Sequence, residues 1–168
     1  MTNPSFQPNV LQRGAQRLAS TALMASVLAR VIHHVDQPLF RLSGGRTTLT
    51  SLVTGLPVVT LTTTGAKSGQ PRTVPLIAIP DGDQMVLIAS NFGQAHHPAW
   101  VLNLRATPQA TIARNGITRS YVAHEAEGAE YDEYWRRAVA LYAGYAAYKE
   151  RTSGRRIPIM VLAPTGKA

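Results

Sequence analysis

Apolar side chains are spaced differently on the two sides of residue 55. Across residues 11–35 they recur at intervals of three and four, which predicts an amphipathic helix that ends before Pro38. Residues 43–55 are rich in Gly, Ser and Thr and are typical of a connector. We therefore expect an N-terminal tail and amphipathic helix over residues 1–45, followed by one folded domain over residues 46–168.

After residue 55 the apolar residues form short β-branched runs separated by turn residues, as in strands. The runs predict six strands: Pro57–Thr64, Thr73–Ile79, Gln84–Ser90, Gln109–Arg114, Ile117–Glu125 and Ile157–Leu162. Asn115-Gly116 is a strong hairpin signal, because both residues tolerate the positive φ of a type I′ turn. Pro158 should place the last strand at an edge or a bulge, because proline has no N–H for a sheet hydrogen bond.

Two helices are expected among these strands. Residues Pro98–Arg105 predict a short one, with Pro98 suited to a first helical turn. Residues Glu130–Tyr145 predict a longer one, whose first turn carries acidic side chains that the helix dipole favours. Strands that follow one another with few helices between them give an α+β fold, and we expect a mostly antiparallel barrel.

Composition narrows the chemistry of this domain. The 168 residues include no cysteine, which excludes disulfides, thiolate metal sites and a cysteine nucleophile. The formal net charge of +8 favours an anionic partner. Nucleic acid is not expected, because the cations are scattered and no recognition motif is present. Without a run of about twenty apolar residues or a signal peptide, we expect a cytoplasmic protein.

The N-terminal helix leaves several partners open. Its apolar side can pack on the domain that follows, or against a second copy of the chain in a homodimer. Arg13, Arg17 and Arg30 also suit an anionic membrane surface, and that arrangement would make the protein membrane-associated. The sequence by itself does not choose among these partners.

The segment Thr62–Arg72 is the first candidate for chemistry, because a strand runs there into a Gly/Ser loop that holds two cations. Glycines let backbone N–H groups approach an anion, Ser68 adds a hydroxyl donor, and Lys67 and Arg72 add charge. This composition predicts a phosphate cradle. It is not a P-loop, since the Gly-x-x-x-x-Gly-Lys-Ser/Thr spacing is absent. An ordinary basic hairpin turn is the alternative.

The segment Ala89–Leu104 is the second candidate. A strand ends there in a small polar loop that opens a helix at Pro98, so free backbone donors can face an anionic or carbonyl-bearing ligand. Trp100 would supply an aromatic wall. His96 and His97 do not predict a metal site, because adjacent histidines point in different directions and no carboxylate follows at ligand spacing. We expect both histidines to be exposed and expect no metal.

Both candidate segments, and the tyrosine-rich segment that follows them in the chain, contain residues that match the pattern of a known family. The residues are Gly65-Ala66-Lys67-Ser68-Gly69, Arg72, Pro75-Leu76, Ala89-Ser90, Gly93, Pro98, Trp100, Asn103-Leu104, Tyr142, Tyr145, Tyr148 and Ile157-Pro158-Ile159. In these residues the chain resembles the deazaflavin-dependent nitroreductase family of actinobacteria, from about Pro57 to the last strand. The resemblance implies a split β-barrel, related to FMN-binding oxidases but adapted to coenzyme F420. The phosphate and oligoglutamate tail of F420 would explain the positive charge.

The resemblance also assigns roles to individual residues. It implies that the phospholactyl group of F420 is held by Lys67, Ser68, Gly69 and Arg72. It implies that the deazaflavin ring is flanked by Pro75, Ala89, Ser90 and Asn91, and that the pocket is closed by Trp100 and Asn103. On the acceptor side it implies an aromatic wall of Tyr142, Tyr145 and Tyr148, with contacts from Ser90 and Ile77. A tyrosine hydroxyl such as that of Tyr145 could donate the proton that completes reduction, although the spacing of the tyrosines by itself predicts ordinary packing.

As an enzyme, the chain would be an F420-dependent oxidoreductase of nitroreductase, ene-reductase or quinone-reductase type. It would pass a hydride from F420H2 to a quinone, an enone or a nitro compound. Two alternatives are the same barrel with FMN, and a non-catalytic binder that holds F420 or docks on membranes. The best-known nitroimidazole-reducing relative has a tyrosine in place of Ile77 and a lysine in place of Asn91. Without that lysine, contacts to the cofactor tail would fall to Arg105 or Arg114.

Overall fold

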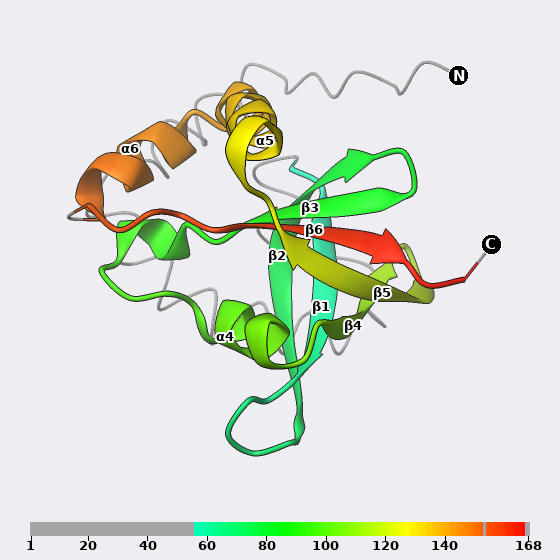
Figure 1. The fold of residues 1–168 in the computed structure, drawn as a ribbon. Helices are drawn as coiled ribbons and strands as arrows, with labels where there is room; N and C mark the ends of the chain where they lie inside the picture. Colours follow the sequence, from blue (N-terminus) through cyan, green and yellow to red (C-terminus); the bar gives the residue numbers. More distant parts are fainter. Residues whose placement is uncertain (1–55, 153, 167–168) are drawn as a thin grey trace.

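The computed structural model describes residues 56–152 and 154–166 (Figure 1). The strands are β1 (Val58–Thr64), β2 (Pro71–Asp81), β3 (Gln84–Ile88), β4 (Gln109–Arg114), β5 (Ile117–Glu125) and β6 (Ile159–Pro164). The helical elements are a short 3-10 turn η1 (Asn91–Gly93) and the helices α4 (Ala99–Ala106), α5 (Gly128–Leu141) and α6 (Gly144–Arg151). The predicted N-terminal helix and the boundary between residues 45 and 46 lie outside the described residues.

The six strands close into a barrel in the order β1-β2-β3-β6-β5-β4. Every pairing in the barrel is antiparallel. The prediction of an α+β split β-barrel is therefore confirmed. Within the described residues no helix is long and apolar enough to cross a membrane.

Strands β3 and β6 are buried on both faces, because alternate side chains of a strand point to opposite sides of the sheet. Met85 and Leu87 of β3 point into the barrel core, whereas Val86 and Ile88 point outward into a second core. The second core lies under α5 and α6, which cover this side of the barrel (Figure 1). The apolar runs of β3 and β6 thus serve two cores at once.

The prediction of one helix over Glu130–Tyr145 is wrong, because the chain breaks into α5 and α6. Tyr142 is extended there, with φ −147° and ψ 103°. Its ring lies against Gly144, where a Cβ atom would collide with the ring. A glycine at the start of α6 therefore leaves room for the tyrosine that ends α5.

The prediction that Pro158 places the last strand at an edge or a bulge is also wrong. β6 pairs with β3 on one side and with β5 on the other. Pro158 lies just before the strand, where no ladder hydrogen bond needs its missing N–H, and its carbonyl accepts the N–H of Ala89 at 2.9 Å. The proline therefore leads into an interior strand at no cost to the ladder.

Candidate functional site

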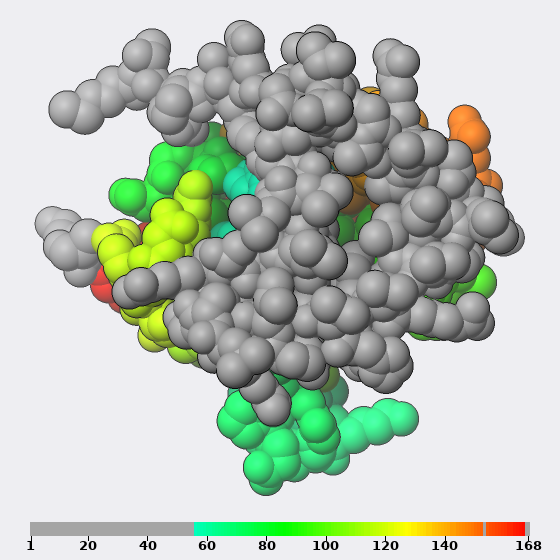
Figure 2. Space-filling view, turned by 180° about the vertical axis from the view of Figure 1, so that it is seen from behind, coloured from blue at the N-terminus to red at the C-terminus, as the bar shows by residue number. Residues whose placement is uncertain are grey.

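The tip of the β1–β2 hairpin, which comprises residues 65–72 and so includes the first two residues of β2, projects from the barrel (Figures 1 and 2). The N–H of Gly65 donates to the carbonyl of Gln70 at 2.9 Å, and the N–H of Gly69 donates to the carbonyl of Gly65 at 2.8 Å. Gly69 has φ +65°, a left-handed conformation that favours glycine. The tip is therefore closed by its own backbone.

Asn103 of α4 ties this tip to the barrel. Its Oδ1 accepts the N–H of Ala66 at 2.9 Å, and its Nδ2 donates to Oγ1 of Thr63 at 3.0 Å. The asparagine is buried, with 7% of its surface exposed. The side-chain amide of Asn103 thus links the tip to β1 and α4. This is a contact of the chain with itself, and the sequence motif gave no sign of it.

Lys67 and Arg72 are the cations of the tip, and both are exposed. Neither forms an ion pair with a described residue. Arg72 Nη2 donates to Oγ of Ser68 at 3.4 Å, so guanidinium and hydroxyl lie together. An anion at the tip would therefore meet side-chain donors.

The backbone of the tip offers less to an anion than its composition suggests. Described partners already accept the N–H groups of Gly65, Ala66, Ser68, Gly69 and Gln70. The expected cradle of backbone donors is thus mostly used to close the turn. Charge and the Ser68 hydroxyl are what the tip presents outward.

Ser90 and Asn91 belong to a loop over residues 89–97 that follows β3. Asn91 and Phe92 both have positive φ, 49° and 55°. The side-chain Nδ2 of Asn91 donates to the carbonyl of His96 at 3.1 Å, which closes the loop locally. Gly93 has φ +80°, and a Cβ on it would lie 3.0 Å from the carbonyl oxygen of Tyr148. The loop therefore packs directly against the backbone of α6.

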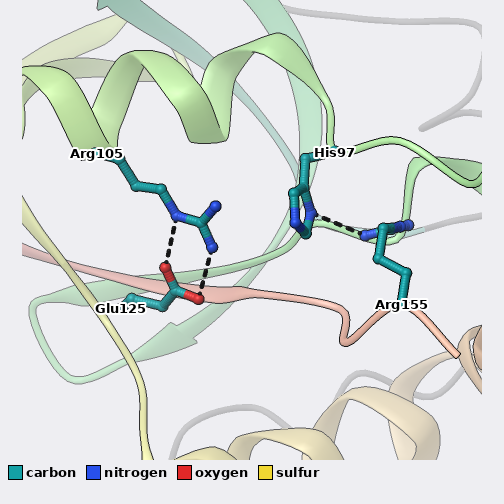
Figure 3. Close-up of polar contacts among 4 residues, drawn as sticks. All are labelled: His97, Arg105, Glu125 and Arg155. Atoms are coloured by element: carbon teal, nitrogen blue, oxygen red, sulfur yellow. Dashed lines mark hydrogen bonds and ion pairs between the residues drawn. The ribbon is translucent and has the colours of Figure 1, made fainter.

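Arg155 grips the same loop, although no sequence pattern drew attention to it. Its Nη2 donates to the carbonyl of Ser90 at 2.9 Å, and its Nε donates to the carbonyl of Gln94 at 3.1 Å. Its Nη1 lies 3.1 Å from Nδ1 of His97 (Figure 3). His97 is consequently half-buried and engaged, whereas the sequence predicted an exposed residue. A contact across some sixty positions leaves no local signal, so sequence reasoning could not find it.

Arg105 is committed to a partner and does not face a ligand. Its Nε and Nη2 donate to the two carboxylate oxygens of Glu125 at 2.9 Å and 3.0 Å (Figure 3). A bidentate pair of this kind uses the planar fork of the guanidinium. Arg105 is thus a poor candidate for contacts to a cofactor tail.

The three tyrosines form one buried cluster. The ring centroids of Tyr142 and Tyr145 lie 5.4 Å apart in an edge-to-face arrangement, and the hydroxyls of Tyr142 and Tyr148 are 3.1 Å apart. Burial raises the pKa of all three phenols. The hydroxyls therefore stay protonated at neutral pH. Phe92 of the loop and Ile77 of β2 pack against the same core.

The structure brings the predicted site residues into two groups. The first is the hairpin tip with Asn103, and the second is Ile77 with the three tyrosines and the loop. Pro75 lies between them on β2. From Arg72 to Ile77 the strand spans roughly 17 Å, at about 3.3 Å per residue. Trp100 and Ala89 are in the barrel core, where 6% and 1% of their surfaces are exposed, so they support the site from inside.

A comparison with protein-family models gives the chain its family. Residues 31–164 match the model of the F420H(2)-dependent quinone reductases. The chain belongs to this family.

Individual members of the family agree with the match. An F420H(2)-dependent quinone reductase of Mycobacterium tuberculosis is 38% identical over 111 residues, which cover 63% of this chain and 72% of that protein. A solved structure of an F420-H2 dependent reductase, FDR-A, aligns with a TM-score of 0.58 at 36% identity, over 63% of this chain and 93% of that one. Another, described as a domain-swapped dimer, aligns with a TM-score of 0.61 at 34% identity, over 77% of this chain and 97% of that one.

The outer face of β1 and β2 fits the cofactor that gives this quinone reductase family its name. Val59 and Leu61 point into the barrel core, so Thr60 points to the outer face, opposite Pro75 in the strand register. Thr60 is buried, and its Oγ1 has no hydrogen-bond partner in the part of the chain that the structure describes. A buried hydroxyl of this kind needs an explanation, and a polar ligand on this face would supply one. With the cations of the tip at one end, this face suits an anionic, elongated group such as F420.

Within the described residues no group of three or more His, Cys, Asp or Glu side chains is placed to hold a metal ion. The donor set of the candidate site is instead hydroxyls, amides and cations. Such donors suit phosphate, carboxylate and carbonyl groups.

Proposed function

We propose that this chain transfers a hydride from F420H2 to a quinone-class acceptor, in keeping with its family. The observation that carries the proposal is the projecting hairpin tip, where Lys67 and Arg72 lie without ion pairs to described residues. The acidic residue of β2, Asp81, is at the other end of the strand from this tip. A positive tip on a firmly tied hairpin suits an anionic cofactor.

In this proposal the tip holds the anionic arm of the cofactor. Lys67, Ser68 and Arg72 donate to its phosphate, and Gly69 lets the arm approach the turn closely. Asn103 does not need to touch the cofactor, because its amide keeps the tip in place. The barrel thus binds the arm through side chains mounted on a rigid turn.

The ring of the cofactor would lie farther along β2, with Pro75 on one side and Ser90 and Asn91 on the other. The buried Trp100 and Ala89 would back this region from the barrel core. When bound, F420H2 supplies the hydride, and the protein positions the acceptor against it. The residues of the chain therefore bind, orient and exclude water.

The acceptor would lie at the end of the site that holds the tyrosine cluster. Ile77 and Tyr148 would contact it, while Ser90, Tyr142 and Tyr145 would face the reacting atoms. Since burial raises the pKa of these phenols, each is present as a neutral hydroxyl that can donate a hydrogen bond or a proton. Tyr145 is our candidate for the proton that completes the reduction.

Several finer points belong to the same proposal. Quinones, enones and nitro compounds are all candidate acceptors, and the family name favours quinones. Ile77 and Asn91 replace the tyrosine and lysine of the nitroimidazole-reducing relative, so we expect weak activity on nitroimidazoles. F420 is preferred over FMN on the family match. Assembly as a homodimer, contact with a membrane through the N-terminal helix and a cytoplasmic location stay predictions.

The double variant Lys67→Ala/Arg72→Ala tests the proposal most directly. Charge-assisted hydrogen bonds contribute about 1.5–3 kcal/mol each, so we expect the loss of both to raise the Kd for F420 by about two to four orders of magnitude. Titration of F420 fluorescence measures this change. The free energy of unfolding should stay within about 0.5 kcal/mol, because exposed cations contribute little to stability.

The variant Arg119→Ala/Arg136→Ala is the matched control, since it removes two exposed cations away from the tip. It should change the Kd for F420 by less than about threefold. Equal losses of affinity in the two double variants would mean that the net charge of the protein, and not the position of the cations, governs binding. No loss in either variant would overturn the assignment of the tip as the binding site for the anionic arm. Oxidation of F420H2 by a quinone, followed by absorbance, then separates an enzyme from a non-catalytic binder.

A further inference from the structure

A single arginine from a distant part of the chain closes the loop over residues 89–97. Arg155 lies between α6 and β6, outside any helix or strand. Its guanidinium donates to the carbonyls of Ser90 at 2.9 Å, Gln94 at 3.1 Å and Ala89 at 3.4 Å. Two of these carbonyls lie at the start of the loop and that of Gln94 lies near its middle, so one planar fork fixes them relative to one another.

The loop needs such a hold because its backbone is unusual. Asn91 and Phe92 are consecutive residues with positive φ, a conformation that costs free energy in residues other than glycine. Surrounding contacts must therefore over-determine it. The N–H of Gly93 donates to the carbonyl of Ser90 at 3.0 Å, and Arg155 donates to the same carbonyl, so the turn and the arginine act on one atom.

His97 completes the arrangement as an acceptor. An arginine has no lone pair to offer, so Nδ1 of His97, at 3.1 Å from Nη1, must accept the hydrogen bond. His97 is therefore neutral in this state. Four of the five N–H donors of the Arg155 guanidinium then have hydrogen-bond partners in the protein. Arg155 is therefore unsuited to bind an anionic ligand itself.

We propose that Arg155 is a positioning residue, which with neutral His97 as its acceptor holds the loop so that Ser90 and Asn91 face the cofactor. The consequence for the reaction rests on the proposed function. The hold on the loop is a property of the protein by itself. Arg155 thus acts through the loop and does not touch the reacting atoms.

The charges around His97 make the hold sensitive to acid. Burial lowers the pKa of His97, and the positive charges of Arg155 and Arg105 lower it further, while Glu125 opposes them. Glu125 is engaged by Arg105 (Figure 3). The neighbouring His96 places its own Nδ1 3.3 Å from the carbonyl of His97. Protonation of His97 removes the lone pair and puts a second cation against Arg155, so the loop should loosen as pH falls.

Hydrogen–deuterium exchange on the full chain without cofactor tests the hold directly. In Arg155→Ala the protection factors of residues 89–97 should fall about tenfold, because the carbonyl contacts of the loop are lost. The matched control is Arg156→Ala, whose guanidinium lies over the ring of Tyr131 at 4.3 Å. It should leave the loop protected. Arg155→Lys should rescue only in part, because an ammonium cannot span the three carbonyls.

His97→Gln gives a second, independent measurement, since a glutamine side chain keeps an acceptor but does not titrate. The natural chain should lose loop protection as pH falls below the ordinary pKa of histidine, and His97→Gln should keep it. In steady-state assays the KM for F420H2 should rise about tenfold in Arg155→Ala, and the acid limb of kcat/KM should flatten in His97→Gln.

These results separate the inference from the proposed function. Equal loop protection in Arg155→Ala and Arg156→Ala would overturn the positioning role, and so would an unchanged acid response in His97→Gln. If the natural chain does not bind F420, the proposed function fails, while the exchange measurements still decide whether Arg155 holds the loop.

Discussion

The hairpin tip and the loop over residues 89–97 are both turns at the candidate site, but they are held in different ways. The tip is closed by hydrogen bonds among neighbours in sequence, with Asn103 as a side-chain tie from outside. The loop is held by Arg155 and lies against α6. Both turns contain a glycine with positive φ, Gly69 and Gly93. Their surroundings differ, since a Cβ on Gly69 meets open space and one on Gly93 meets α6.

This difference teaches which part of a site a short motif can encode. A turn that closes on itself carries its geometry in its own residues, so the Gly65–Gly69 motif predicts it. The residues of a turn that depends on a distant side chain determine only part of the conformation of that turn. For the loop over residues 89–97, the rest is determined by contacts with Arg155 and with the backbone of Tyr148.

The largest effect that separates the two turns is expected from the glycines. Gly93→Ala forces a left-handed alanine and puts a Cβ 2.9 Å from that of Arg151 and 3.0 Å from the carbonyl of Tyr148. The left-handed backbone costs about 1–2 kcal/mol, and crowding of a packed site adds about 1–3 kcal/mol. We expect the free energy of unfolding to fall by about 2–5 kcal/mol, as measured by urea denaturation.

Gly69→Ala is the matched control, because it shares the positive φ but has no atoms near the new Cβ. It should cost only the backbone term, about 1–2 kcal/mol. If the two alanines cost the same, the loop is not packed against α6 in the way described, and the comparison between the turns loses its physical basis.

The next effect concerns the tie between the tip and the barrel. Asn103→Ala leaves the N–H of Ala66 and the hydroxyl of Thr63 without their partner, which should lower the free energy of unfolding by about 1–2 kcal/mol. Affinity for F420 should also fall, since the tip loses its support. Leu102→Ala on the same helix is the control, because Leu102 is 49% exposed. A loss at Leu102 as large as the loss at Asn103 would show that the hydrogen bonds of the Asn103 amide are not what stabilises this region.

Local signals predicted most of the barrel. The strands Gln109–Arg114 and Ile117–Glu125 have the predicted bounds, because β-branched runs and Asn115-Gly116 act over a few residues. The break between α5 and α6 was missed, since it depends on the ring of Tyr142 lying over Gly144. Periodicity alone cannot report such a contact.

The same distinction between local signals and long-range contacts applies to the candidate site. The cations Lys67 and Arg72 were predicted and lie exposed on the tip. The motif also pointed to Asn103 as a residue near the cofactor, but its hydrogen bonds go to the chain itself. Thr60 and Arg155 had no sequence signal. A partnerless hydroxyl and a grip on distant carbonyls appear only when the strands and loops are assembled.

The smallest expected effect is a difference in pH dependence between the hydrogen bonds at the two ends of β2. At the end away from the tip, the Tyr134 hydroxyl donates to Oδ2 of Asp81 at 2.8 Å. This bond, followed by Arg137, holds the pKa of Asp81 below its ordinary value. A carboxylate with a lowered folded pKa adds stability above its unfolded pKa of about 3.9, and that stability is lost as pH falls through the folded pKa.

Tyr134→Phe should therefore lower the free energy of unfolding by less than about 1 kcal/mol near neutral pH, because solvent screens a carboxylate that is 39% exposed. Burial and the bond to Asp81 raise the pKa of Tyr134 to about 12, so the phenol stays protonated and only Asp81 titrates. The cost of the variant should shrink below about pH 4, whereas the cost of Asn103→Ala should not change with pH, because neither of its partners titrates. Denaturation of both variants from about pH 7 to about pH 3 measures the contrast, and a cost of Tyr134→Phe that is constant with pH would show that the phenol acts there by packing alone.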